Sequence, residues 1–466
     1  MKKFWSIIGL CLMLVILVAP VALAEEAAPA APTIDSGDTA FVLISSALVL
    51  LMTPGLAFFY GGMVRTKNVL SVIMQSFFIV ALISVQWVLW GYSLAFGTDV
   101  NGLIGGLNFL GLNGVGFDPV NATATIPHLA FMIFQAMFAV ITPALITGAF
   151  AERMKFPAFV VFTLIWATII YDPVAHWVWG GGWLASLGVL DFAGGTVVHI
   201  LSGVSGLVIA LMLGKRKGHG SEAMLPHHLP MTVLGASLLW FGWFGFNSGS
   251  ALAANGLAAM AFVTTNTAAA SATLSWVAVE WFHHGKPTVL GAASGAVAGL
   301  VAVTPAAGFV SPLSSVIIGL LAGVICYVSV GIVKAKLGYD DALDAFGVHG
   351  VGGTFGALAT GLFASKEINP AGADGLFFGN PDQFVTQLIG VVASWAIAVI
   401  GTYIIIKVIG LFMKIRADED QEVQGLDITE HGERSYAEDF LTGSTAIPFA
   451  TLAQPSTKST EVSLNS

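Results

Sequence analysis

The sequence has little charge and almost no cysteine. Only 10% of its 466 residues are charged, whereas 56% are hydrophobic, and its mean hydropathy is +0.85. A water-soluble domain needs a more polar surface, so this composition predicts a multi-pass membrane protein. The net charge of -9 leaves no basic surface for nucleic acid. The two cysteines are Cys11 and Cys326, and we expect no disulfide because Cys11 lies in a segment that we expect to be removed.

The first 24 residues have the three regions of a secretory signal peptide. A basic start precedes an apolar run from residue 4 to about residue 21, and Ala22 to Ala24 supply a cleavage site. We therefore expect residues 1–24 to be removed and residues 25–37 to form a short outer segment. The alternative is an uncleaved first span, because the apolar run is close to the minimum length for spanning.

Apolar segments that could cross a hydrocarbon core of about 30 Å recur eleven times in the mature chain. The predicted fold is therefore an all-α polytopic membrane protein with eleven transmembrane helices in residues 38–412 and a tail over residues 413–466. The expected spans are 38–62, 69–96, 125–149, 156–173, 192–213, 229–249, 256–281, 288–304, 312–333, 341–363 and 384–412.

The basic residues give this topology a direction. They follow the odd-numbered spans, and cytoplasmic loops are the ones that carry Lys and Arg. The loops on the other side contain a single basic residue, Lys366. We therefore expect an outer N-terminus and an inner C-terminus. The inner basic residues are Arg65, Lys67, Arg153, Lys155, Lys215, Arg216, Lys217, Lys286, Lys334 and Lys336.

One pattern occurs twice, 150 residues apart: Asp191 with His199, and Asp341 with His349. Ionisable groups are costly inside a membrane, so each histidine is a candidate pathway residue. Spans one to five and six to ten form two halves of opposite orientation, the inverted repeat common in transporters. Eight residues at about 1.5 Å each place each histidine about 12 Å from its own face. In a core of about 30 Å, this leaves roughly 6 Å between the two along the membrane normal, so they could meet.

Small residues and acids near the spans have structural explanations. Gly291, Gly295 and Gly299 form a stripe that lets helices pack closely, and Gly352 and Gly356 form another. Acids favour helix N-termini, and we expect that role for Asp340, Asp341 and Asp344. For Asp191 two roles stay open, capping and a negative potential beneath a cation site.

Three stretches closely resemble the ammonium transporter family, and further matches cover nearly the whole mature chain. The three are residues 191–199 (DFAGGTVVH), 243–250 (WFGFNSGS) and 346–353 (FGVHGVGG). The further matches are residues 134–138 (FQAMF), 148–153 (GAFAER), 175–182 (AHWVWGGG) and 425–433 (GLDITEHGE).

The resemblance implies a homotrimer of eleven-helix subunits in a bacterial inner membrane, each with a narrow apolar pore for ammonium-derived nitrogen. It implies an outer ammonium site at Phe138, Trp179 and Ser250, and a phenyl gate at Phe138 and Phe246. Three further roles are implied: His199 and His349 line the pore, Asp191 supports the outer site without touching the ion, and Trp243 is structural. It also implies a tail that contacts the neighbouring subunit and, in many bacterial members, a PII-type regulator at the inner face.

The residue types suit this chemistry on physical grounds. Aromatic faces can hold a cation, with about 0.5 to 2 kcal/mol gained, and the Ser250 hydroxyl can accept a hydrogen bond. An intact cation is costly in a dry pore whereas ammonia is not, so deprotonation near the gate lowers the barrier. Neutral imidazoles have one donor and one acceptor and can then pass hydrogen bonds along the pore.

Several alternatives stay open at this stage. We favour net transport of ammonium over a passive ammonia or carbon dioxide channel of Rhesus type, because Trp179 and Ser250 complete a cation site that those relatives generally lack. A third possibility is an ammonium sensor. No enzyme, metal or cofactor is expected, because His199 and His349 have no third ligand at their depth. The acidic tail is expected to be ordered over residues 415–440 and disordered after about residue 445, and Arg434 departs from the family pattern there.

Overall fold

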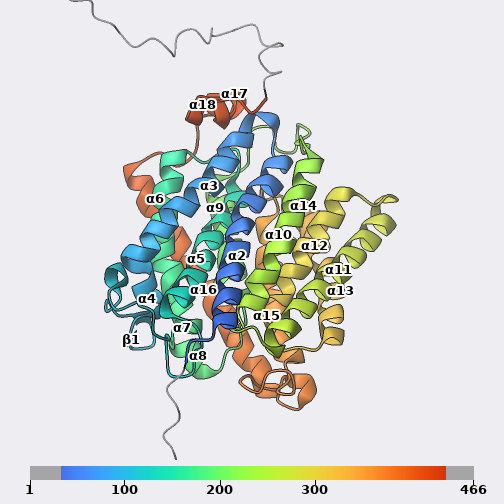
Figure 1. Cartoon of the computed structure of the whole chain (residues 1–466). Coiled ribbons are helices and arrows are strands. Elements are labelled where there is room, and N and C mark those ends of the chain that lie inside the picture. Colours follow the sequence, from blue (N-terminus) through green and yellow to red (C-terminus); the bar gives the residue numbers. More distant parts are fainter. Residues whose placement is uncertain (1–32, 437–466) are drawn as a thin grey trace, which may run out of the picture.

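The computed structural model describes residues 33–436. The predicted signal peptide, most of the outer segment and the end of the tail therefore lie outside the described residues. Within residues 33–436, nine helical segments are long and apolar enough to cross a membrane, and Val289–Val303 is a shorter apolar helix. The helices run roughly side by side, with the tail helices α17 and α18 at one end and α8 and β1 at the other (Figure 1).

The first half of the bundle is built from long helices interrupted by π-helical turns. A short antiparallel hairpin, β1 with β2, lies in the loop after α4. The elements are α2 (Ser36–Met63), η1 (Thr66–Asn68), α3 (Val69–Gln86), η2 (Trp87–Gly91), α4 (Tyr92–Phe96), β1 (Asp99–Val100), β2 (Ile104–Gly105), η3 (Leu110–Leu112), α5 (His128–Phe150), α6 (Phe156–Trp166), η4 (Ala167–Tyr171), α7 (Asp172–Trp179), α8 (Trp183–Leu187), η5 (Gly195–Ile200) and α9 (Leu201–Leu213).

The second half repeats this arrangement and is followed by one long helix and the tail. Its elements are α10 (Leu229–Gly249), α11 (Gly256–His284), α12 (Val289–Val303), α13 (Pro312–Tyr327), η6 (Val328–Val333), α14 (Lys334–Leu337), η7 (Phe346–Gly350) and α15 (Val351–Phe363). The remaining elements are η8 (Leu376–Phe378), α16 (Pro381–Phe412), α17 (Glu419–Gln424) and α18 (Leu426–His431).

Packing between the halves pairs corresponding helices. The first helices of the two halves, α2 and α10, pack along each other, and α9 packs on η7 while α15 packs on η5. The predicted glycine stripes lie at close contacts, as expected: a Cβ on Gly299 would be 2.4 Å from the Ala268 carbonyl, and one on Gly356 would be 2.2 Å from the Ala302 carbonyl. These contacts bring helix backbones close together without large side chains between them.

The predicted span boundaries agree with the helices except at one functionally important place. The fourth span was expected to end near residue 173. The helix instead continues through η4 and α7 to Trp179. Asp172 is fully buried, and Gln86 Nε2 donates to its Oδ2 at 2.7 Å. This partner allows the acid to remain inside the helix.

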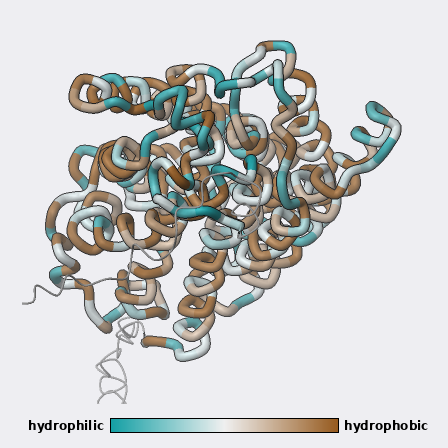
Figure 2. The backbone as a smooth tube through the Cα atoms, turned by 90° about the horizontal axis from the view of Figure 1, so that it is seen from above, coloured by the Kyte–Doolittle hydropathy of each residue, from teal (hydrophilic) through white to brown (hydrophobic). Residues whose placement is uncertain are grey.

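The tail folds back onto the loops at its own end of the bundle. The Asp427 carboxylate accepts hydrogen bonds from the backbone N–H groups of Leu70 and Ser71, and Lys67 Nζ donates to the Glu422 and Val423 carbonyls. The expectation of an ordered tail is therefore confirmed up to Tyr436, and residues beyond it lie outside the described part. Seen from the tail end, hydrophilic residues gather in the connecting segments while the helices are mainly hydrophobic (Figure 2).

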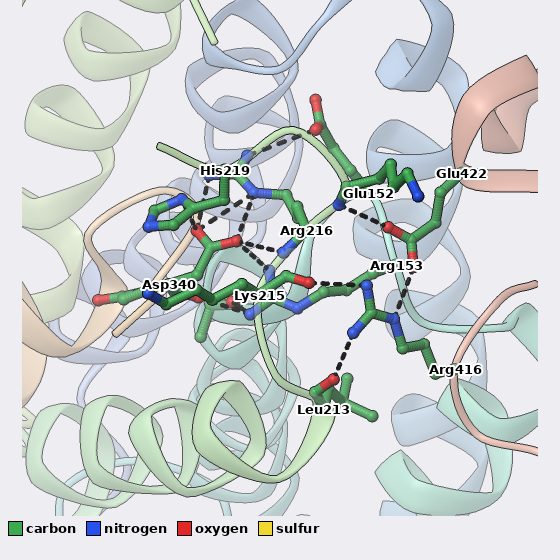
Figure 3. Close-up of polar contacts among 12 residues, drawn as sticks. Glu152, Arg153, Leu213, Lys215, Arg216, His219, Asp340, Arg416 and Glu422 are labelled. Carbon is green, nitrogen blue, oxygen red and sulfur yellow. Dashed lines mark hydrogen bonds and ion pairs between the residues drawn. The ribbon is translucent and has the colours of Figure 1, made fainter. Parts of the chain in front are cut away.

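A buried ion cluster joins three loops at the tail end of the bundle (Figure 3). The Asp340 carboxylate accepts from Arg216 N, Nε and Nη2 at 2.8 to 2.9 Å, and Arg216 Nη1 lies 3.4 Å from Glu152 Oε2. Burial alone would raise the pKa of Asp340, but the bonds from Arg216 outweigh burial and hold the pKa below its ordinary value. Burial would also raise the pKa of Glu152. The guanidinium groups of Arg216 and Arg65 outweigh this effect and keep the Glu152 pKa below its ordinary value.

This cluster corrects two sequence expectations. Asp340 and Asp344 were expected to favour helix N-termini, but their side chains form ion pairs: Asp340 with Arg216, and Asp344 with Lys334 at 2.5 Å. Arg216 lies 124 residues from Asp340 in the chain, so a long-range partner replaces the local capping role that a helix start suggests. Only Asp341 caps η7 as expected, accepting from Ala345 N and Phe346 N.

Candidate functional site

The two histidines of the repeated pattern meet inside the bundle. His199 on η5 and His349 on η7 are almost fully buried, with 1% and 3% exposed. Their Nδ1 atoms are 3.3 Å apart, and the rings are stacked with centroids 5.3 Å apart. A bond between two ring nitrogens needs one donor and one acceptor, so the two imidazoles share one hydrogen along this contact.

Two glycines explain why the histidine helices can cross so closely. Gly203 follows His199 by four residues, and a Cβ on it would lie 2.0 Å from the Gly350 backbone nitrogen. Gly353 follows His349 by four residues, and a Cβ there would lie 2.8 Å from His199 Cβ. Each helix thus presents a glycine to the other helix beside its histidine. The sequence carries this signal as His-x-x-x-Gly in both halves, and our sequence analysis missed it.

The aspartate of each pattern fixes the start of its histidine helix. Asp191 Oδ1 accepts from Gly194 N and Gly195 N, and Oδ2 accepts from Thr196 N. A carboxylate that accepts several backbone N–H groups caps the first turn of η5. Two roles were left open for Asp191, helix capping and a negative potential beneath a cation site. These contacts are those of a helix cap. Asp341 caps η7 in the same way, which makes the two segments structural equivalents.

A column of rings runs from Trp179 to the histidines. The Phe138 and Phe246 rings lie 4.3 Å apart, which brings the predicted gate residues together. Phe246 is 6.1 Å from the His199 ring. Trp243 stacks on His199 at 5.4 Å, and its Nε1 donates to Thr304 Oγ1 at 2.8 Å. Trp243 therefore both packs against the histidine and is held in place by α12.

The space around the histidines is small and mainly apolar. A cavity of about 10 Å³ is lined by ten apolar side chains in addition to His199 and His349. Another, of about 20 Å³, lies on the other side of His349 and is bordered by Tyr60 and Asp344. Such volumes accommodate about one water-sized molecule. His199 Nε2 finds no hydrogen-bond partner within residues 33–436, so it is available to a small polar molecule in the pore.

Trp179 and Ser250 lie next to the phenyl pair, as the predicted outer site requires. Trp179 was expected in a loop, but it is the last residue of α7, and its Nε1 donates to the Asp191 carbonyl at 2.9 Å. Its ring is 5.7 Å from Phe138. Ser250 follows the last residue of α10, and its Oγ donates to the Phe246 carbonyl at 2.9 Å. The Ser250 hydroxyl uses its hydrogen in this bond, so its lone pairs can accept a hydrogen bond from a donor.

One histidine without an expected role has a structural one. His176 on α7 is fully buried, with Nδ1 2.9 Å from the Ala95 carbonyl and Nε2 2.8 Å from Asp99 Oδ1. These contacts tie the helix that carries Trp179 to the β1–β2 hairpin. This contact was not predicted, because His176 was expected outside the helix.

The described residues do not suggest a metal centre. Within residues 33–436, no three His, Cys, Asp or Glu side chains are grouped so that they could hold a metal ion. The described Cys326 is buried and unpaired. The arrangement is instead a narrow column of aromatic and imidazole rings, with an acceptor-bearing aromatic site at its outer end.

Comparisons with known proteins agree with this arrangement. The chain is 58% identical over 400 residues to an ammonium transporter of Bacillus subtilis, covering 86% of this chain and 98% of that one. The crystal structure of Saccharomyces cerevisiae Mep2 is similar with a TM-score of 0.78 and 39% identity, covering 83% of this chain and 89% of that one. A structure described as a sensor Amt protein is similar with a TM-score of 0.79 and 30% identity, covering 85% and 98%.

The family model described as the Ammonium Transporter Family matches residues 40–436. This match includes the paired aspartate and histidine patterns, the phenyl pair, Trp179 and Ser250. The relatives are named transporters, and a transporter moves its substrate without converting it, so the chain is not an enzyme. The chain is a multi-pass membrane protein and belongs to the ammonium transporter family.

Proposed function

We propose that this chain imports ammonium by separating the ion into ammonia and a proton within the ring column. The ion is recruited at Trp179, Phe138 and Ser250, where an aromatic face and a free lone pair compensate in part for lost water. It loses a proton at the phenyl pair, and ammonia continues past His199 and His349. The observation that carries this proposal is the column itself, which reaches a buried histidine nitrogen that has no hydrogen-bond partner among residues 33–436.

The dry lumen supports deprotonation. A cation in an apolar cavity that holds about one small molecule would lose its hydration, and only the neutral amine avoids this penalty. The histidine pair has a shared hydrogen and can relay the stripped proton. We favour a net transfer of charge with each nitrogen, because an outer cation site has little use in a channel for a neutral gas.

We also propose the finer topology and setting. The nine long spans, α12 and the η7–α15 segment together give eleven crossings, with the N-terminus outside and the C-terminus inside. Residues 1–24 are a signal peptide, 25–37 an outer segment, 38–412 the transport domain and 413–466 a cytoplasmic tail. The protein forms a homotrimer in a bacterial inner membrane, and its inner face is available to a PII-type regulator.

Electrical recording on proteoliposomes tests the transport proposal. We expect an inward current when ammonium is added and none when potassium is added, because potassium has no proton to lose. An alkaline shift inside without charge movement would support a gas channel instead. Binding of ammonium without any flux would favour a sensor, a possibility that the similar sensor Amt protein brings into view.

A further inference from the structure

One ionisable side chain inside the spans takes no part in the ring column. Asp172 lies within the segment Phe156–Leu187, which is long and apolar enough to cross a membrane, and its exposure is 0%. Within residues 33–436 its carboxylate forms no ion pair, and its one hydrogen-bond donor is the Gln86 amide. An ionisable group inside a span is costly, so this pair needs an explanation of its own.

The Asp172 carboxylate has far fewer partners than other buried carboxylates of this chain. Asp340 accepts hydrogen bonds from the Arg216 guanidinium, and Asp191 accepts them from several backbone N–H groups. Asp172 Oδ2 accepts one bond from a neutral amide, and in the described part of the chain Oδ1 accepts none. A buried carboxyl group without a countercharge or further donors takes up a proton, because the neutral form is less costly to bury.

Gln86 also has an oxygen without a partner, and its neighbours fix which amide atom this is. Gln86 Nε2 lies 2.7 Å from Asp172 Oδ2 and 3.4 Å from Thr168 Oγ1. The Thr168 hydroxyl donates its hydrogen to the Leu164 carbonyl, so it can only accept from Gln86, and the amide atom facing it must be the nitrogen. Gln86 Oε1 is therefore an acceptor, and among residues 33–436 no donor reaches it.

The surroundings of this pair are closely packed. Gly91 lies against the Gln86 amide, since a Cβ on Gly91 would be 2.7 Å from both Nε2 and Oε1. Gln86 directly precedes the π-helical turn η2, and Asp172 directly follows the π-helical turn η4. The pair therefore joins the ends of two turns of a kind often found at functional sites. A single hydrogen is the smallest group that can satisfy both remaining oxygens.

We propose that Asp172 is a proton-binding site that holds its proton as a neutral carboxylic acid. Its O–H at Oδ1 donates to Gln86 Oε1 while Gln86 Nε2 donates to Oδ2, which closes a ring of two hydrogen bonds. One proton thus satisfies both oxygens and removes a charge from the span. The closed pair joins α3 to α7, the helix that ends at Trp179, and it keeps its proton while ammonium passes the ring column.

Infrared spectroscopy of the full chain in an ester-free detergent tests for the proton directly. Exposed carboxyl groups are ionised at about pH 7, so the parent should show a carbonyl stretching band of a neutral carboxylic acid that Asp172→Asn removes. Asp382→Asn is the matched control, because Asp382 is exposed in the first turn of α16, and it should leave the band unchanged. A parent without this band, or an Asp172→Asn variant that retains all of it, would overturn the proposal.

A change at Gln86 tests the ring of hydrogen bonds. Gln86→Leu removes the acceptor of the acid O–H, so the band should move to higher frequency instead of disappearing, and the unfolding temperature should fall. Asp172→Asn keeps both bonds, because its Nδ2 can donate to Gln86 Oε1, so it should unfold close to the parent temperature. A band at unchanged frequency in Gln86→Leu would show that the acid has another acceptor and that the ring is wrong.

Ammonium current in proteoliposomes tests whether the proton stays in place. This measurement depends on the proposed transport, whereas the infrared band does not. With the proton held by the closed pair, Asp172→Asn should pass the same current as the parent. A loss of current in this variant at an unchanged unfolding temperature would show that Asp172 releases its proton during transport, which would overturn the closed pair.

Discussion

The histidine pair and the inner ion cluster bury polar groups in opposite ways. In the cluster, the Asp340 carboxylate accepts four hydrogen bonds from Arg216 alone. In the pair, the one side-chain hydrogen bond that each imidazole makes within residues 33–436 joins the two histidines, and His199 Nε2 has no partner there. A buried group with complete partners holds structure together, whereas one with an open position can serve a passing molecule. Both sites are buried, so burial does not distinguish them. The number of hydrogen-bond partners does, and it assigns a structural role to the cluster and a functional role to the histidine pair.

Replacing both histidines should give the largest effect. In His199→Ala with His349→Ala, ammonia in the pore loses hydrogen bonds worth about 1 to 3 kcal/mol, so ammonium current should fall about fivefold to 150-fold. Proteoliposome recording measures this. The matched control is His283→Ala with His284→Ala at the inner end of α11, which should leave the current intact. An unchanged, selective current in the pore variant would remove the pair from the mechanism.

Breaking the cluster should instead reduce stability. Asp340→Asn leaves Arg216 buried without its full countercharge, with an expected loss of about 3 kcal/mol in the free energy of unfolding. Thermal unfolding in detergent measures it. The double variant Asp340→Leu with Arg216→Met removes both charges and should recover part of the loss. If Asp340→Asn were as stable as the parent but lost its current, the assignment of the cluster to structure would be wrong.

A smaller effect extends the comparison to the outer site. Trp179→Leu removes an aromatic face worth about 0.5 to 2 kcal/mol to a cation, so the ammonium concentration for half-maximal current should rise about 2- to 30-fold. The maximal current should change less, because the histidine pair is untouched. Trp177→Leu is the control, since its ring packs on Trp183 and its Nε1 donates to the Leu103 carbonyl outside the column. Equal shifts in both variants would point to a general loss of packing.

The smallest effect is that of mild acid on the cluster. The pKa of Asp340 and that of Glu152 are lower in the folded chain than their ordinary values, so both contribute stability that is present above about pH 4 and is lost as pH falls through the folded pKa. Between pH 7 and pH 5, we therefore expect the cluster to change the unfolding temperature very little. Below about pH 4 the parent should lose stability, and Asp340→Asn should lose less. A steep loss between pH 7 and pH 5 that disappears in Asp340→Asn would contradict this.

Much of the fold and of the site could be predicted from the sequence. The spans follow from apolar length, and the meeting of His199 with His349 follows from two equal spacings in halves of opposite direction. What could not be predicted depended on distant partners. In the sequence, Asp172 suggests a helix end, because its partner Gln86 cannot be identified from the sequence. The helix was therefore expected to end before Trp179, which left Trp179 in a loop. In the sequence, Asp340 likewise suggests a helix cap, because its distant ion-pair partner Arg216 cannot be identified from the sequence.

The π-helical form of η5 and η7 gives the repeated spacing a further meaning. Both histidines lie in turns wider than those of an α-helix, which are often found at functional sites and each accommodate an additional residue. Deleting one residue between Asp191 and His199, or between Asp341 and His349, would remove this additional residue and shorten the stretch between the capping carboxylate and the imidazole. The ring would then be displaced from its counterpart, so insertions and deletions should be tolerated far less in these two short stretches than substitutions are.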